Sequence, residues 1–205
     1  MAQEYHSDTM DEQLLEGDGL PEGDSLQSSV KHYHDHVIAL LRNSLKKNTF
    51  EQIERATKLL LESGAVCVWG QGRDCGLAED VYYKLLEYGK KCDYPRSCHE
   101  LKLRLGTYTT DDVILVVDGE GNDDTLNEIL RQAGENGVKV LAVTENRMSK
   151  LAILGDEAIC YSHGAVQKSE YSYSTTIAQH YMLDLLIQQM IKEQYGSEDT
   201  DISLS

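Results

Sequence analysis

The sequence predicts an α/β fold: a three-layer, doubly wound, mainly parallel sheet of five strands, with extra helices at its N-terminal side. Short apolar runs alternate along the chain with amphipathic segments, and the first two of these runs end at turns that contain glycine. Buried runs separated by helices are typical of parallel strands that are covered on both faces. The 205 residues suit one such domain with a single sizeable core.

Two helices are expected before the first strand. Apolar residues at helical spacing begin near Lys31 and continue to Leu45, and a second helix repeats this pattern up to Leu60. Thr49 precedes the second helix, and Gln52 follows three positions later. This spacing predicts a capping box, in which each side chain bonds the backbone N–H of the other residue.

Four apolar runs and one short edge segment supply the expected strands. The runs span residues 65–69, 113–117, 138–143 and 158–161, and the edge segment spans 91–93. Further helices are expected over residues 78–88, 123–135 and 171–192. Ligands of open parallel sheets lie at the carboxyl ends of the strands. The turns at 70–74, 118–125 and 144–149 therefore hold the candidate site residues.

Charge distinguishes the ends of the chain from this domain. The first thirty residues contain eight Asp or Glu and no Lys or Arg, which is half of the net charge of −16. Such a segment buries too little apolar surface to offset the entropy lost on ordering, so residues 1–28 are expected to be a disordered acidic tail. The domain is then expected over residues 29–195, followed by a polar C-terminal tail at 196–205.

The composition argues against several classes of function. A net charge of −16 repels phosphate backbones and anionic lipids, so neither direct nucleic-acid binding nor membrane binding is expected. No apolar run approaches the roughly 20 residues that cross a bilayer, and the N-terminus lacks a signal-peptide pattern, so a cytoplasmic location is expected. The five cysteines form no CxxC pair, which favours neither disulfides nor zinc. Cys67 and Cys160 lie in apolar runs and are expected to be buried.

The three turns have a recognisable pattern. The first reads Gly70-Gln71-Gly72-Arg73-Asp74, the second reads Asp118-Gly119-Glu120-Gly121-Asn122-Asp123, and the third contains Thr144, Ser149, Leu151 and Ala152. In this order they resemble the sugar isomerase (SIS) family, whose turns read GxGxS, SxSGxT and Thr followed by Ser-x-Leu-Ala. The last helix, with Ser174, Gln179 and Asp184, is similar to the effector domain of RpiR-type transcriptional regulators. Residues 1–30, however, contain no helix-turn-helix pattern.

The resemblance implies a SIS fold with a pocket for a sugar phosphate or another small carbohydrate derivative. All residues of the first turn would line this pocket, together with Asp118, Glu120, Gly121, Asn122, Asp123, Thr144 and Ser149. The resemblance also implies a homodimer or homotetramer, because tyrosine-rich helices of the family meet a second subunit. The corresponding residues here are Tyr82, Tyr83, Tyr88, Tyr171, Tyr173 and Tyr181.

Acidic residues alter the phosphate-binding turn. Asp118, Glu120 and Asp123 stand where the family has hydroxyl residues, which hold the phosphate by donating hydrogen bonds. Ionised carboxylates can only accept. Two charges 4 Å apart repel by about 1 kcal/mol in water and about 4 kcal/mol near a protein surface. A lost hydrogen bond costs about 0.5–1.5 kcal/mol, so repulsion is the larger effect and the usual phosphate-binding mode is disfavoured.

Four interpretations of this site stay open. In the first, the site is degenerate and its acids cap helices, Asp123 or Asn122 after the second turn and Asp74 after the first. In the second, a phosphosugar binds through backbone groups and Arg73. In the third, the ligand is neutral or cationic. In the fourth, a divalent cation such as Mg²⁺ bridges the carboxylates and the ligand. No resident cofactor is expected.

Metal ligands and a catalytic base need separate consideration. His32 and His36 share a helix face, but no third ligand is identifiable, so both are expected at the surface and no metal site is predicted. Heptose-phosphate isomerases of the family have His and Glu where this chain has Asp80 and Lys84, which argues against that activity. Glu170, near the start of the last helix, is the candidate general base of an isomerase.

The sequence therefore favours a non-catalytic sensor that binds a phosphosugar or a related carbohydrate derivative through an altered phosphate loop. The alternative is an aldose–ketose isomerase that acts on a sugar phosphate. A third hypothesis is a scaffold that retains only the fold.

Overall fold

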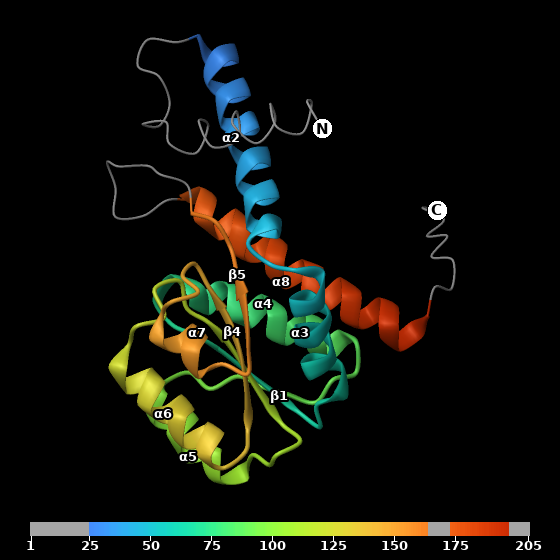
Figure 1. Ribbon diagram of the computed structural model, residues 1–205, viewed down its shortest axis with the longest axis vertical. Helices are drawn as coiled ribbons and strands as arrows, with labels where there is room; N and C mark the ends of the chain where they lie inside the picture. The colour runs from blue at the N-terminus through green and yellow to red at the C-terminus, as the bar shows by residue number, and fades with distance from the viewer. Residues whose placement is uncertain (1–24, 164–172, 197–205) are drawn as a thin grey trace.

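The computed structural model of the chain describes residues 25–163 and 173–196. In this part of the chain a sheet lies between two layers of helices (Figure 1). Its strands are β1 (Val66–Gly70), β2 (Cys92–Asp93), β3 (Val113–Val117), β4 (Lys139–Thr144) and β5 (Glu157–Cys160). They pair in the order β2-β1-β3-β4-β5, and every pair is parallel. The predicted α/β class and five-stranded doubly wound sheet are confirmed.

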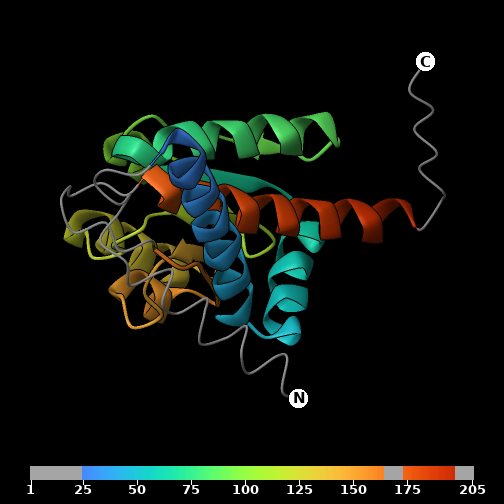
Figure 2. The same cartoon turned by 90° about the horizontal axis from the view of Figure 1, so that it is seen from above.

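Helices cover both faces of this sheet. They are α2 (Leu26–Lys46), α3 (Phe50–Glu62), α4 (Cys75–Glu87), α5 (Cys98–Arg104), α6 (Asp124–Glu135), α7 (Lys150–Leu154) and α8 (Tyr173–Tyr195). One face packs against α3, α4 and α8, and the other against α5, α6 and α7 (Figures 1 and 2). The helix α2 crosses α8 and projects beyond the body of the domain (Figure 1).

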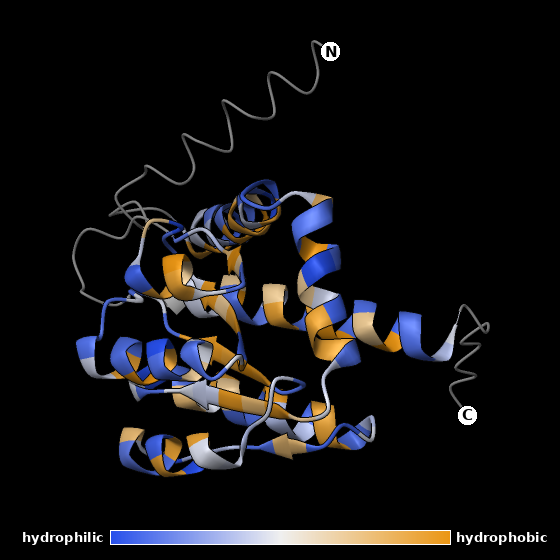
Figure 3. Cartoon of the chain, turned by 60° about the horizontal axis from the view of Figure 1, so that its bottom comes forward, coloured by the Kyte–Doolittle hydropathy of each residue, from blue (hydrophilic) through white to orange (hydrophobic). Residues whose placement is uncertain are grey.

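Alternate residues of each strand form two cores, one on either side of the sheet. On the side of α4 and α8, Leu115 packs with Leu85 and Met182, all fully or almost fully buried. On the side of α6, Val116 packs with Leu130. The alternation explains why whole strands are apolar in sequence, and Figure 3 shows the resulting hydrophobic colours along the strands and on part of each helix.

Local sequence signals set several helix ends. The predicted capping box is present, since Gln52 N–H donates to Thr49 Oγ1 (3.2 Å) and Thr49 N–H donates to Gln52 Oε1 (2.9 Å). The helix α2 begins at Leu26, earlier than the expected Lys31, because the hydroxyl of Ser25 caps it. His36 was expected at the surface, and this prediction is wrong: packing of α2 leaves it only 8% exposed.

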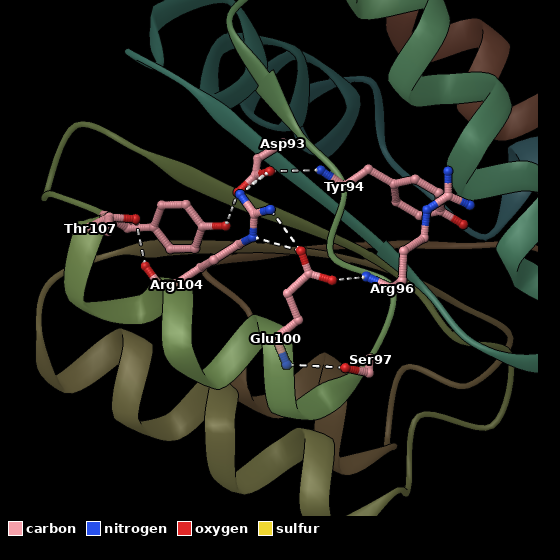
Figure 4. Close-up of polar contacts among 8 residues, drawn as sticks. Asp93, Tyr94, Arg96, Ser97, Glu100, Arg104 and Thr107 are labelled. Atoms are coloured by element: carbon pink, nitrogen blue, oxygen red, sulfur yellow. Dashed lines mark hydrogen bonds and ion pairs between the residues drawn. The ribbon is translucent and has the colours of Figure 1, made fainter.

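An ionic network fixes the short edge strand β2 to α5 (Figure 4). Arg104 donates two hydrogen bonds to the Asp93 carboxylate, at 2.6 and 2.7 Å, and also bonds Glu100. The hydroxyl of Tyr108 donates to the same Asp93 carboxylate at 2.8 Å. A two-residue strand has few ladder hydrogen bonds, so these side chains help to hold it in the sheet.

Several predictions concern residues outside the described part of the chain. They concern Glu170, Tyr171 and most of the proposed tails at 1–28 and 196–205. Residues 26–28, which were expected in the N-terminal tail, belong to α2. The limits of the domain stay predictions. Cys67 and Cys160 are buried, as predicted. No helix among the described residues is long and apolar enough to cross a membrane.

Candidate functional site

The candidate site lies where β1 and β3 end side by side. The chain leaves β1 into α4 on one face of the sheet, and leaves β3 into α6 on the opposite face. This divergence is the topological switch point of a doubly wound sheet, where ligands of such folds bind. Three loops meet there: the first loop (residues 70–74), the second loop (118–123) and the third loop (144–149).

Close backbone packing shapes the first loop. A Cβ on Gly70 would lie 2.6 Å from the carbonyl oxygen of Asp74 and 2.8 Å from the Cβ of Ala78, so this position has no room for a side chain. Gly72 has a φ of +60°, which favours glycine. Gln71 Nε2 donates to Asp123 Oδ2 at 3.0 Å and links this loop to the second. The side chain of Arg73 is exposed.

Carboxylates occupy three backbone donors around the second loop. Asp118 Oδ1 accepts from the N–H of Gly121 at 3.0 Å. Asp123 Oδ1 accepts from the N–H of Leu126 at 2.8 Å, which makes Asp123 the N-cap of α6 as predicted. The third donor, the N–H of Gly119, bonds Asp74 at 3.3 Å. Backbone N–H groups at a helix start are the usual donors to a bound anion, and here the carboxylate of Asp123 takes one of them, the N–H of Leu126.

Asp74 does not cap α4, contrary to the sequence-based expectation. Its carboxylate turns toward the second loop and α8, with Oδ2 bonded to Gly119 N–H and Oδ1 bonded to Gln179 Nε2 at 2.9 Å. Both partners lie far away in the chain, so no local pattern revealed them. Asp74 therefore connects the first loop, the second loop and the last helix.

The third loop packs against the second loop and forms hydrogen bonds with it. The hydroxyl of Thr144 donates to Gly119 O at 2.8 Å. Ser149 is buried, caps α7 by accepting from Ala152 N–H, and lies against Gly121, where a Cβ would be 2.6 Å from its Oγ. Asn122 Oδ1 accepts from the N–H of Lys150 at 3.3 Å. The predicted residues Thr144, Ser149 and Asn122 are thus brought to the site, but their described hydrogen bonds are with protein groups.

Burial and neighbouring charge act on the acids of the site in different ways. Burial raises the pKa of Asp74, although hydrogen bonds from Gln179 and Gly119 partly oppose this. Burial also raises the pKa of Asp118, and the charges of Asp123 and Glu120 add to the rise. The backbone N–H of Leu126 and the amide of Gln71 lower the pKa of Asp123. Glu120 is exposed.

Sequence reasoning did not single out two residues that border the second loop, although one of them, Glu145, lies in the predicted turn at 144–149. Tyr161, directly after β5, is fully buried, and its hydroxyl accepts from Gln179 Nε2 at 2.8 Å. A Cβ on Gly119 would lie 2.9 Å from this hydroxyl and 3.0 Å from Glu145 Oε1, so Tyr161 and Glu145 both border the second loop. Tyr161 directly follows β5, so inspection of the carboxyl end of every strand would have found it.

A second charged cluster lies between α4 and α8. Oxygen and nitrogen atoms of Asp80, His180 and Asp184 lie within 4.8 Å of one another, in the manner of metal ligands. The ammonium of Lys84, however, stands 2.6 Å from both carboxylates and 3.4 Å from His180 Nε2. Burial lowers the pKa of Lys84, but its bonds to Asp184 and Asp80 outweigh this and the net shift is upward. Lys84 stays charged and offsets part of the negative charge of Asp80 and Asp184, and its bonds tie α4 to α8.

The doubly wound sheet and its three loops place the chain in the class of open α/β domains with a switch-point site. More specifically, the chain belongs to the SIS domain family, whose model matches residues 59–189. An HTH-type transcriptional regulator of Clostridium perfringens, uncharacterised, is 26% identical over 159 residues, which are 78% of this chain and 57% of that protein. The predicted kinship with RpiR-type regulators is confirmed by the HTH-type transcriptional regulator RpiR of Escherichia coli, which is 26% identical over 110 residues, 54% of this chain and 37% of that protein. The chain thus spans little more than half the length, or less, of these relatives.

Solved structures share the fold. The Vibrio vulnificus NanR protein complexed with ManNAc-6P superposes with a TM-score of 0.73 at 16% identity, over 85% of this chain and 64% of that one. The sugar isomerase domain of an RpiR transcription factor from Sphaerobacter thermophilus gives a TM-score of 0.69 at 20% identity, over 80% of this chain and 89% of that one. At these identities the likeness shows the fold and nothing further about the ligand.

Proposed function

We propose that this chain is a non-catalytic sensor that binds a small carbohydrate derivative at the switch point between β1 and β3. Membership of the SIS family supports carbohydrate binding, as does the fold shared with a NanR protein complexed with ManNAc-6P. The arrangement of the second loop supports the altered mode of binding. Asp74, Asp118 and Asp123 accept from the N–H groups of Gly119, Gly121 and Leu126, so three backbone donors around the second loop are already bonded to carboxylates.

A comparison of hydrogen-bond and charge-repulsion energies favours the altered mode of binding over an ordinary phosphate pocket. A phosphate that displaced one of these carboxylates would regain a hydrogen bond worth about 0.5–1.5 kcal/mol. It would also face the displaced charge, at about 1–4 kcal/mol for a separation of 4 Å. The repulsion is the larger quantity unless a cation such as Mg²⁺ intervenes.

A thermal-shift panel of sugars and sugar phosphates, with and without Mg²⁺, tests the proposal. A ligand at 100 times its Kd stabilises the folded state by about 2.7 kcal/mol, which is a readily measured rise in Tm. We expect a rise without isomerisation of the bound sugar. If no sugar phosphate raises Tm, replacement of Asp118 and Glu120 together by Ser is expected to create a response. A chain that binds no carbohydrate in any form would contradict the sensor and favour the scaffold.

The second candidate is an aldose–ketose isomerase with Glu170 as its base. The observation that favours it is the sugar isomerase domain among the structural neighbours. Turnover of a bound sugar phosphate that disappears in Glu170→Gln, with binding retained, would decide for the enzyme. The proposal also includes assembly into a homodimer or homotetramer and a cytoplasmic location, both of which stay predictions.

A further inference from the structure

We propose that two copies of this chain associate through their α2 helices, which run antiparallel, so that the projecting half of each helix covers an apolar groove on the other copy. The inference rests on the assembly that forms part of the proposed function, and it names the surface that this assembly would use. The surface has two parts: an apolar stripe on α2 (Leu26, Val30 and Tyr33) and a groove between α2, α3 and α8.

The stripe is the uncovered end of a longer apolar face of α2. Alternating spacings of four and three residues join Leu26, Val30, Tyr33, Val37 and Leu40. Residues at this spacing share one face of a helix, and the repeat is typical of a helix that pairs with another helix. Leu40 is fully buried in the core, whereas Leu26 is 81% exposed. The domain therefore covers the C-terminal half of this face, and the described residues leave open the N-terminal half, which projects from the body (Figure 1).

The groove lies at the other end of α2 and has a volume of about 330 Å³. Its apolar lining includes Leu45 from the last turn of α2, Ile53 from α3 and Leu185 from α8. Phe50, the first residue of α3, also lines the groove and is 82% exposed. An apolar surface with a polar border is typical of an interaction site. The remaining residues that line the groove are Glu54, Thr57, Gln189 and Glu193.

A second copy of the chain covers both parts of the surface at once. In an antiparallel pair of helices, the N-terminal half of each helix lies beside the C-terminal half of the other. The stripe belongs to the first half of α2 and the groove adjoins its last turn, so a two-fold axis that brings stripe and groove together does so twice. The 21 residues of α2 span about 30 Å, which keeps the two contacts separate. The order of the two parts along α2 therefore favours a second copy over a different protein.

Charge permits this approach where most of the chain would resist it. The chain has a net charge of −16, so two copies repel one another. Residues 26–36 of α2, however, carry one Lys and one Asp and are neutral when their histidines are uncharged. The groove is lined by Glu54 and Glu193, and Glu54 bonds Lys58 at 2.9 Å. Residues 1–24, with eight Asp or Glu and no Lys or Arg, would meet repulsion from these acids, whereas the neutral half of α2 does not.

Cross-linking between two variants with one exposed cysteine each tests the pairing. Val30→Cys and Phe50→Cys are made separately, each together with Cys75→Ser, Cys92→Ser and Cys98→Ser, and the two full-length chains are coexpressed and treated with a short bismaleimide. We expect a cross-linked dimer that contains one copy of each variant, which mass spectrometry identifies, because the stripe of one copy lies in the groove of the other. Val30→Cys alone is expected to give no product, since the two stripes lie at opposite ends of an antiparallel pair.

A matched control and a second readout complete the test. Leu103→Cys, on α5 and 67% exposed, replaces Phe50→Cys in the control and is expected to give no product with Val30→Cys. Light scattering is the second readout: Phe50→Glu is expected to halve the mass of the assembly, and Leu103→Glu to leave it unchanged. Circular dichroism confirms that each variant is folded.

The outcomes separate this inference from the proposed function. A cross-link of Val30→Cys with itself would show a parallel pair and overturn the inference. Absence of the mixed cross-link, or an assembly whose mass Phe50→Glu leaves unchanged, also overturns it but leaves the predicted assembly standing. A monomeric wild type overturns both, and carbohydrate binding at the switch point is measured independently of all three results.

Discussion

At Asp118 one carboxylate acts on stability in two opposite ways. It accepts the N–H of Gly121 and so closes the second loop. It also keeps a charge in a partly buried place beside Asp123 and Glu120, and its pKa is raised in the folded protein. Below the unfolded-state pKa of about 4 the carboxyl is protonated in both states and carries no penalty. The penalty on the folded state develops as the pH rises from the unfolded-state pKa to the raised pKa and stays constant above it.

Asp118→Asn therefore is expected to raise the Tm at pH 7, because the amide keeps an oxygen for Gly121 and removes the buried charge. The gain is expected to shrink as the pH falls and to vanish near pH 4, about the unfolded-state pKa. Thermal denaturation across this range measures the difference, with Glu87→Gln as an exposed control whose Tm follows the wild type. A gain that is equal at both pH values, or a loss at pH 7, would contradict the account.

At the scale of elements, two loop glycines with positive φ differ in how closely other atoms approach them. Gly121 has a φ of +65° and lies on Ser149, whereas Gly72 has a φ of +60° with no atom within 4 Å of a Cβ. At Gly121 both the positive φ and the close neighbours require glycine, whereas at Gly72 only the positive φ does. The two glycines therefore form a matched pair.

Gly72→Ala is expected to cost about 1–2 kcal/mol, the usual cost of a left-handed conformation for a residue with a Cβ. Gly121→Ala is expected to cost more, because its Cβ would stand 2.6 Å from Ser149 Oγ. Urea denaturation gives both values, and the overlap at Gly121 also involves the Cβ atoms of Ser149 (2.9 Å) and Leu151 (3.0 Å). Equal costs at the two glycines would show that the second loop moves freely away from α7.

At the scale of the whole molecule, several helices of the described part of the chain expose apolar side chains, among them α2 and α4. On α2, Leu26 is 81% exposed, Val30 59% and Tyr33 46%. The N-terminal part of this helix projects from the body (Figure 1). On α4, Tyr83 is 55% exposed. Of the predicted interface tyrosines, Tyr82, Tyr88 and Tyr181 are half-buried, Tyr171 lies outside the described residues, and the side chain of Tyr173 is likewise not described.

Light scattering after size exclusion is expected to give two or four times the chain mass of 23.0 kDa. Apolar surface of this kind is typical of interfaces. Val30→Glu with Tyr33→Glu is expected to lower the mass, whereas Leu103→Glu, equally apolar and exposed on the opposite helical layer, is expected to leave it unchanged. A monomer in the wild type would refute the predicted assembly.

Those features of the fold that depend on neighbours in sequence could be predicted. The apolar run at 113–117, the capping box of Thr49 and the N-cap at Asp123 each depend on residues within a few positions. Helix periodicity, cap chemistry and strand burial are local, so the order of elements and the α/β class follow from the sequence. The strand ends also gave the location of the site.

Tertiary structure decided what the site residues bond. Asp74 has a capping position in sequence, yet it bonds Gly119, 45 residues away, and Gln179, 105 residues away. Tyr161 and Glu145 join the second loop only because β4 and β5 end beside it. A hydrogen bond forms only where packing brings donor and acceptor together. When the two residues are far apart in sequence, no local sequence pattern indicates the bond. The sequence by itself determined which acids lie at the candidate site, and the folded chain determined that three of them accept the N–H groups of Gly119, Gly121 and Leu126.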